Sequence, residues 1–280
     1  MYSEINLDLQ AFATRVYDSI LYQSTFYNFL NPNYIGTLRQ TGAPVIEVPK
    51  TVPLSVNVRQ TKEIQSRLNP ALTTYEHTMV DLTELNMDYS IRIPLMVAGS
   101  DIANAIQDAA DLEDAAIAEQ IDTYGYGKLA AANIDEAEWN PSTQEEYVTT
   151  LNSLRANLFN KKVTGDYRLG LGAVEYSNLV SALTSVLKFE TLEGREGVSM
   201  GEIARVYGIS IFEINDNVLT DTGYFFNPIA VVGDTFFSAF VQHTSPQGYP
   251  GYYVLEGTQS FGAAVVRPEA IIRLVEEVSA

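Results

Sequence analysis

Cysteine is absent from this chain of 280 residues, and there are only two histidines. The lack of cysteine excludes disulfide bonds, cysteine-ligated zinc and thiol catalysis together, and it fits a protein made in a reducing cytoplasm. No run of roughly 18 apolar residues occurs, so no membrane-spanning helix is expected. Residues 1–10 carry Glu4 and Asp8 without a preceding basic segment, so they lack the pattern of a signal peptide.

Positive charge is also in short supply. The chain has 17 basic and 35 acidic residues, a formal net charge of −18, and residues 101–150 alone hold 1 basic against 12 acidic residues. Tight binding to nucleic acid needs Lys and Arg to neutralise phosphates, so a broad DNA-gripping face is excluded. Two interpretations of the acidic segment remain open: a solvated helix face, or a surface that repels DNA and lets it pack without adhering.

Catalytic and ligand-binding motifs are scarce as well. No Gly-x-Ser-x-Gly elbow or Walker-type phosphate loop is present, and Gly170-Leu171-Gly172 lacks the third glycine of a dinucleotide fingerprint. His77 is expected at a surface or interface and His243 in a loop. Residues 135–140 lack the glycine of an EF-hand loop, and Asn215-Asp216-Asn217 is expected to cap its own turn. We therefore expect no catalytic, cofactor-binding or metal-ligating residues.

Strand-like alternation of apolar and polar residues marks the stretch 45–93. The apolar positions on the two sides of a polar segment, Gln60–Thr74, are Leu54, Val56 and Val58, then Leu85, Met87, Tyr89, Ile91 and Ile93. Val80 and Leu82 are out of phase with Leu85, which predicts a β-bulge near Thr83. The pattern predicts a hairpin with strands of about 15 residues, or about 50 Å.

A hairpin of that length is long compared with the rest of the chain. The remaining residues, about 200 of them, are expected to form a body with a radius of gyration of only about 16–17 Å. The hairpin must therefore either wrap around this body or project beyond it. Projection onto a neighbouring subunit is the preferred interpretation, and Pro49 and Pro53 place the first strand at a sheet edge.

Helical periodicity appears in four segments: 6–30, 99–131, about 143–158 and 175–187. The second has one narrow apolar stripe, and its other faces are crowded with carboxylates, interpreted as a solvated surface rather than as acid–base pairs. Those carboxylates are Asp108, Asp111, Glu113, Asp114, Glu119 and Asp122. Thr143 and Glu146 form a capping-box signature for the third helix.

Short strands fill the last third of the chain, after a polar, glycine-containing loop at 190–201. Strands are predicted at 167–171, 209–214, 224–232, 236–241, 252–256, 261–267 and 270–275. Helices beside strands in this order indicate an α+β fold.

The order of these elements resembles the major capsid proteins of tailed bacteriophages over nearly the whole chain. Three segments carry the resemblance besides the order: Arg205–Phe212 is similar to a glycine-centred strand of that family, Ile229–Phe236 to a strand ending in Gly-Asp plus an aromatic, and Phe261–Arg273 to its closing strands. The resemblance implies the phage major-capsid fold, with an N-terminal arm, an extended β-hairpin loop, a long spine helix, a peripheral α+β domain and a β-rich axial domain.

The resemblance also implies a division of the chain into domains. The expected ranges are 1–44 for the arm, 45–94 for the extended loop, 95–204 for the peripheral domain with the spine helix at 99–131, 205–245 for the axial domain, and 246–280 for strands that return to the peripheral domain.

The function implied by the resemblance is structural, not enzymatic. The expected protein is a subunit of an icosahedral virus capsid, made in the host cytoplasm, that assembles with itself into hexamers and pentamers around double-stranded DNA without sequence-specific binding. A separate scaffolding protein and a portal are further expected partners, and no membrane is involved. Two alternatives remain open: an encapsulin-like nanocompartment shell, and a hydrolase that uses the scattered carboxylates.

Overall fold

The computed structural model of the chain describes residues 19–20, 23–35, 45–50, 76–94, 102–183, 202–206, 208–244 and 251–276. The helices are the 3₁₀ helix η1 (Phe26–Phe29), α3 (Ile102–Ala131), α4 (Gln144–Asn160), α5 (Ala173–Leu183) and the 3₁₀ helices η2 (Pro228–Ala230) and η3 (Pro268–Ala270). The strands are β1 (Val45–Lys50), β2 (Glu76–Asp81), β3 (Leu85–Pro94), β4 (Asp135–Glu138), β5 (Tyr167–Gly172), β6 (Glu202–Val206), β7 (Ile209–Ile214), β8 (Gly223–Phe226), β9 (Val231–Thr244), β10 (Tyr252–Val265) and β11 (Ile271–Val275).

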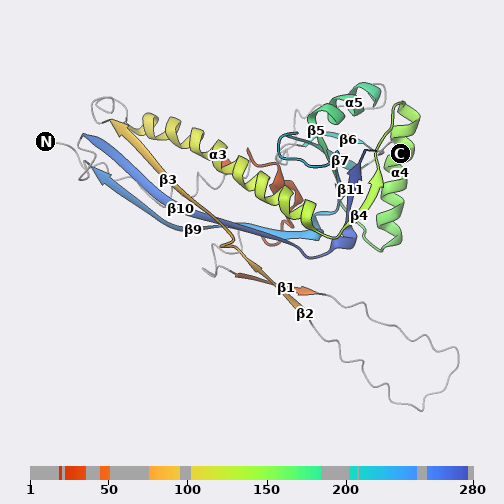
Figure 1. The fold of residues 1–280 in the computed structure, drawn as a ribbon, viewed down its shortest axis with the longest axis horizontal. Helices are drawn as coiled ribbons and strands as arrows, with labels where there is room; N and C mark the ends of the chain where they lie inside the picture. Colours follow the sequence, from red (N-terminus) through yellow and green to blue (C-terminus); the bar gives the residue numbers. More distant parts are fainter. Residues whose placement is uncertain are drawn as a thin grey trace, which may run out of the picture.

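A long three-stranded antiparallel sheet forms one half of the molecule. Its strand order is β3-β10-β9, and β10 pairs with β3 from Phe261–Leu85 to Tyr252–Pro94. The helix α3 runs along this sheet (Figure 1). Leu85 and Met87 of β3 pack against the main core, which explains why every second residue of this strand is apolar.

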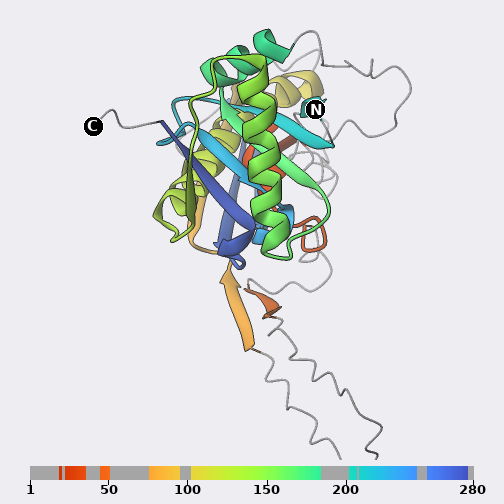
Figure 2. The ribbon, with the colours of Figure 1, turned by 90° about the vertical axis from the view of Figure 1, so that its right-hand side faces the viewer.

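A six-stranded mixed sheet forms the other half, with the order β4-β11-β8-β5-β7-β6. Its central strands are buried on both faces, and β5 pairs parallel with β7 but antiparallel with β8. Figure 2 shows α4 in front of this sheet, and α4 contacts α5. The helix α4 buries Tyr147, Leu151, Leu154 and Leu158, and Thr143 and Glu146 form the predicted capping box.

An aromatic cluster joins the two halves. Phe29 of η1 stacks on Phe226 of β8 with ring centroids 3.7 Å apart, and Phe26 meets Phe261 of β10 edge to face at 6.2 Å. Gly125 of α3 makes room for this cluster, because a Cβ there would lie 2.4 Å from the Phe26 ring. The segment 23–35 is therefore wedged between α3 and both sheets.

The predicted helix over 6–30 is wrong at its C-terminal end. Residues 26–29 form a 3₁₀ helix; Thr25 before it keeps right-handed helical backbone angles, and Leu30 after it is extended. In this tighter helix Phe26 and Phe29, three residues apart, lie on one side with their rings stacked 5.8 Å apart, and both enter the aromatic cluster. The arm up to residue 18, the tip at 60–74, the loop at 190–201 and the end of the helix predicted at 175–187 lie outside the described residues.

The prediction of one continuous hairpin over 45–93 is also wrong. Among the described residues of this segment, β1 pairs with β2 from Val45–Asp81 to Lys50–Glu76. The chain then turns at residues 82–84, and β3 joins β10 in the three-stranded sheet. The phase break predicted as a bulge near Thr83 is thus a turn at which the chain changes sheets.

Other sequence-based boundaries shift in a similar way. No strand was predicted at β4 or β6, and the strands predicted at 252–256 and 261–267 are one strand, β10. The strand predicted at 224–232 is instead two strands separated by η2, because Pro228 cannot donate a ladder hydrogen bond.

Sheet membership crosses the domain ranges expected from the sequence. β5 and α5 of the range 95–204 belong with β7 and β8 of the range 205–245, whereas β9 of that second range lies in the three-stranded sheet. β10 and β11 of the range 246–280 are divided between the two sheets. Naming the two halves as peripheral and axial domains stays a prediction.

Candidate assembly site

The strands β1 and β2 form a hairpin that leaves the body of the molecule, which we call the projecting hairpin. In both views it extends away from the two larger sheets (Figures 1 and 2). It is a sheet of only two strands, so among the described residues each strand keeps one edge without a pairing partner. Such an edge presents backbone N–H and C=O groups that another chain can bind.

The two faces of the projecting hairpin differ. One face packs on the chain's own body, where Ile46, Val48, Val80 and Leu82 form a buried cluster with Val232 of β9. The other face is exposed: Met79 is 69% exposed, and Val45, Glu47, Pro49 and His77 also lie at the surface. The expectation that the hairpin's apolar side is completed only by another copy is therefore wrong for the residues next to the body.

His77 lies on the exposed face, as its polar neighbours predicted. Its Nδ1 is 3.1 Å from Oε1 of Glu47 on the opposite strand, and both side chains are about half exposed. An exposed pair of this kind adds little stability. Its position on the outward face gives the hairpin a polar group beside the apolar Met79.

The root of the projecting hairpin is held in two ways. Leu82 is fully buried, and the backbone of Asp81 and Leu82 passes so close to Gly262 of β10 that a Cβ there would lie 1.9 Å from the Asp81 carbonyl oxygen. Two residues along, the Glu84 carboxylate accepts hydrogen bonds from the Tyr124 hydroxyl and the Lys128 ammonium group, both on α3.

This contact changes the acidity of all three side chains. The hydrogen bond from Lys128, with that from Tyr124, lowers the pKa of Glu84. Burial, together with the bond to Glu84, raises the pKa of Tyr124 to about 12, and the bond to Glu84 raises the pKa of Lys128. At neutral pH the contact is therefore an ion pair supported by a neutral phenol.

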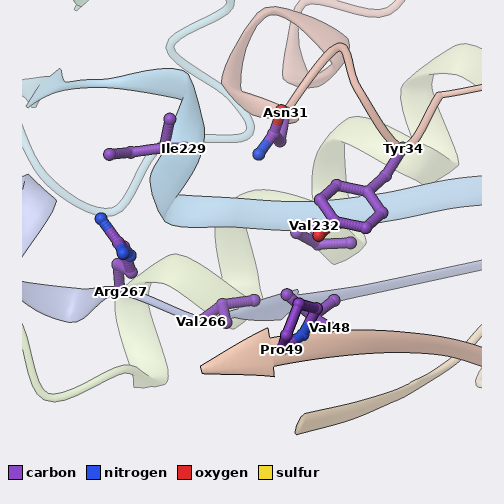
Figure 3. Close-up of a pocket in the computed structure, with 8 residues that line it drawn as sticks. All are labelled: Asn31, Tyr34, Val48, Pro49, Ile229, Val232, Val266 and Arg267. Atoms are coloured by element: carbon purple, nitrogen blue, oxygen red, sulfur yellow. The ribbon is translucent and has the colours of Figure 1, made fainter. Parts of the chain in front are cut away.

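A groove of about 210 Å³ separates the projecting hairpin from part of the body. Figure 3 shows Val48 and Pro49 of β1 on one side, with the body residues around them. The residues that line it are Asn31, Tyr34, Val48, Pro49, Ile229, Val232, Val266 and Arg267. The hairpin is thus closely packed at its root and less closely packed beside this groove.

Asp122 of α3 anchors the segment before η1. Its Oδ1 accepts hydrogen bonds from the Ser24 hydroxyl at 2.5 Å and the Phe26 N–H at 3.0 Å. Its Oδ2 accepts from the Thr25 N–H at 3.1 Å and the Thr25 hydroxyl at 2.8 Å. Burial raises the pKa of Asp122, and these hydrogen bonds act in the opposite direction with a smaller effect.

Arg273 of β11 links the six-stranded sheet to the end of α3. One terminal nitrogen donates to the carbonyl oxygens of Leu129, Ala130 and Ala132 at 3.2, 2.7 and 3.3 Å, and the other donates to Glu136 at 3.1 Å. Its Nε lies 3.4 Å from Asp221, an ion-pair distance without hydrogen-bond geometry. A guanidinium group thus caps the negative end of the helix dipole.

The other sequence candidates do not gather into a site. His243 lies in β9, not in a loop, because the strand continues to Thr244. Gly170–Gly172 is part of β5, and the Asn217 N–H donates to the Asn215 side chain, as predicted for a self-capping turn. Asp135 pairs with Lys161.

Neither a metal-binding cluster nor a membrane-spanning helix occurs among the described residues. No group of His, Asp and Glu side chains suited to a metal ion occurs in the described part of the chain. Within those same ranges, no helix has the length and apolar character needed to cross a membrane.

Sequence reasoning missed the residues that do the anchoring. Asp122 was grouped with the solvated carboxylates of its helix, yet it is only 7% exposed, and Asp114 is 2% exposed. Neither Glu84 nor Arg273 was predicted to have a role from the sequence. The one available signal was the break of phase near Thr83, since a chain that changes sheets there needs contacts to hold the turn.

Three-dimensional comparison with solved structures identifies the fold: the chain has the fold of the major capsid proteins of tailed phages. No family model matches the sequence, and a search of curated proteins gives no match.

Three of the similar structures show how far the likeness extends. A chain from Mycobacterium phage Che8 has a TM-score of 0.61 and 15% sequence identity, covering 90% of this chain and 91% of that one. The capsid of the cyanophage P-SCSP1u has a TM-score of 0.58 and 16% sequence identity, covering 85% of this chain and 84% of that one. A virus-like particle from Pyrococcus furiosus has a TM-score of 0.54 and 13% sequence identity, covering 93% of this chain and 96% of that one. The fold predicted from the order of elements is confirmed.

Proposed function

We propose that this chain is a structural subunit of an icosahedral bacteriophage capsid, and not an enzyme. It assembles with itself into hexamers and pentamers that enclose packaged double-stranded DNA. The observation that carries the proposal is the projecting hairpin on a phage capsid fold, with unpaired strand edges and an exposed face among the described residues. A hairpin of this form gains stability when a second copy covers it.

The exposed face of the hairpin supports self-association. Met79 is 69% exposed and Val45 is 39% exposed, and these side chains lie on the outward face. Fully burying a side chain of this size contributes about 1.5–3 kcal/mol. Each subunit would make such contacts with its neighbours, so modest single contacts add up over a closed shell.

Further parts of the proposal concern partners and place. The protein is made in the host cytoplasm and resides in the virion, with a separate scaffolding protein and a portal as its other partners. The encapsulin-like alternative is not favoured, because similar structures carry phage, capsid or virus-like-particle names. Particle contents distinguish the two, since a capsid holds genomic DNA and a nanocompartment holds a cargo enzyme.

Deleting Gln60–Thr74 is expected to abolish particle formation while leaving the subunit folded. These residues connect the ends of β1 and β2 and are not part of the described core. Negative-stain microscopy and light scattering would measure assembly, and circular dichroism with thermal unfolding would measure folding.

A control variant replaces the same residues with a Gly/Ser linker of equal length. If the linker variant also fails to assemble, the sequence of the tip matters and not only its length. Normal particles from the deletion would refute the role proposed for the hairpin.

The purified subunit is expected not to retain double-stranded DNA. Its net charge of −18 leaves few groups to neutralise phosphates. The dissociation constant should be weaker than the range of about 10⁻⁶–10⁻⁴ M of non-specific binders at physiological salt. An electrophoretic mobility shift measures this, and a strong shift that weakens steeply with salt would contradict enclosure without gripping.

A further inference from the structure

We propose that two contacts at the turn 82–84 fix the direction of the projecting hairpin, and we call them together the mount. One is the close backbone contact with Gly262, which we call the seat. The other is the contact of Glu84 with Tyr124 and Lys128, which we call the latch. The inference rests on the proposed function, because the direction of the hairpin has a consequence only when the hairpin reaches another copy. Gly262, Glu84, Tyr124 and Lys128 are then positioning residues for assembly.

The seat is a contact between two backbones. A Cβ on Gly262 would lie 1.9 Å from the Asp81 carbonyl oxygen and 2.6 Å from the Leu82 Cα. No side-chain rotation can relieve contacts with backbone atoms, so any larger residue at 262 must displace the turn. Leu82 itself is fully buried, which holds the turn against β10.

The latch lies two residues further along the turn. One oxygen of Glu84 accepts from both the Tyr124 hydroxyl and the Lys128 ammonium group. Lys128 also lies 5.2 Å from the centre of the Tyr124 ring, so the two donors support each other. Both belong to α3, and the latch therefore ties the hairpin root to the longest rigid element of the body.

The groove beside the hairpin provides room for it to tilt. Val48 and Pro49 of β1 line the groove, and Tyr34, Val266 and Arg267 line it from the body (Figure 3). Val48 also packs in the buried cluster with Val232, so the groove leaves only part of the hairpin's inner face unfilled. A hairpin that pivots at residues 82–84 into this space is displaced more along β1 and β2 than at the turn. The side chains of the mount would in this way set the angle between neighbouring copies.

The test measures the direction of the hairpin directly. Because the chain has no cysteine, Met79→Cys on β2 and Phe159→Cys on α4 can carry a single pair of spin labels. Both positions are exposed, at 69% and 63%. Electron–electron double resonance on labelled full-length chain, diluted with unlabelled chain, gives the distribution of distances between hairpin and body.

The substitutions are expected to change the distribution of distances in different ways. Glu84→Gln and Lys128→Met should each add a second population of distances, with the ratio of held to released hairpin falling about fivefold, as expected for loss of a partly exposed ion pair. The double variant Glu84→Lys with Lys128→Glu should restore one population. Gly262→Ala should shift the main distance, and Asp135→Asn, which breaks the distant pair with Lys161, should change nothing.

Several outcomes would overturn the inference. One such outcome is an unchanged distance between the two spin labels in Glu84→Gln, Lys128→Met and Gly262→Ala. Another is that the double variant with exchanged charges fails to restore the original distribution of distances. If Gly262→Ala does not fold, the exposed substitutions at Glu84 and Lys128 still decide the matter.

Assembly is scored separately by electron microscopy of the same variants. Particles of altered size or curvature from variants with a redirected hairpin support the inference. If the hairpin is redirected and the particles are still normal, the direction of the hairpin does not control assembly, and that part of the inference is wrong. If the unmodified chain forms no particles, the proposed function fails, while the distance distributions still report whether the mount exists.

Discussion

Replacing Arg273 with methionine is expected to lower the free energy of unfolding by about 3 kcal/mol, because several buried or partly buried acceptors lose a charged donor at once. The Arg273 side chain is only 15% exposed, and it donates to three carbonyl groups at the end of α3 and just beyond it, those of Leu129, Ala130 and Ala132. Methionine keeps much of the volume, so the loss reports the polar contacts.

Arg273→Lys should lie between the wild type and Arg273→Met. An ammonium group can approach either the carbonyl oxygens of α3 or the carboxylates of Glu136 and Asp221, but it lacks the planar fork that reaches both. The double role of Arg273 thus depends on guanidinium geometry and not on charge alone.

Urea unfolding of the unassembled chain, followed by circular dichroism, measures the loss. The matched control is Arg155→Met, because Arg155 is exposed on α4 and only lies near the Tyr167 ring. A change below about 0.5 kcal/mol is expected for this control. Equal effects of the two substitutions would contradict the role of Arg273 as the link between α3 and the six-stranded sheet.

Asp122→Ala is expected to cost about 2–3 kcal/mol and to loosen the segment 23–35 from α3. The substitution leaves the N–H groups of Thr25 and Phe26 and two hydroxyl groups without their shared acceptor. Because Phe26 and Phe29 follow directly, the aromatic cluster that joins the two sheets should also lose order.

Two measurements separate these effects. Hydrogen exchange at the amides of residues 24–30 should accelerate in Asp122→Ala, and thermal unfolding should shift to lower temperature. Glu119→Ala, one turn earlier on the same helix and exposed, removes a carboxylate without these contacts and serves as the control. Unchanged exchange in Asp122→Ala would show that packing alone holds the segment.

The same carboxyl group gives a pH dependence with a defined sign. Burial raises the folded-state pKa of Asp122 above its ordinary value of 3.8. A carboxyl group with a raised folded-state pKa stabilises the protein in its protonated form: the contribution is complete below pH 3.8 and is lost as the pH rises through the folded-state pKa. The stability advantage of the wild type over Asp122→Asn should therefore grow as the pH falls from 7 towards 4.

Local patterns in the sequence were sufficient for several elements. The stripe of Tyr147, Leu151, Leu154 and Leu158 with its capping box predicted α4, and the short strands predicted in the last part of the chain placed β5, β7 and β11 to within two residues. These features depend on side chains within one or two turns or along one strand, so the sequence contains all the information required.

The candidate site was only partly predictable. Alternation from residue 45 to 93 indicated strands and a reach beyond the body, but it did not reveal that β3 would leave the hairpin for β10. A period of two tells that a strand has one buried face. It does not tell which distant strand accepts its hydrogen bonds, because that choice depends on residues about 170 positions away in the sequence, as in the pair Tyr89 and Gly257.

By itself, therefore, the sequence determined an acidic, cysteine-free α+β chain, the positions of its main helices, and a strand-rich segment that must either wrap around the body or project beyond it. The tertiary structure decided how strands pair and which charged groups become anchors. Asp122, Glu84 and Arg273 look like ordinary surface residues in their own segments. They become structural contacts only because folding brings them together with donors and acceptors from 40 to 144 residues away in the sequence.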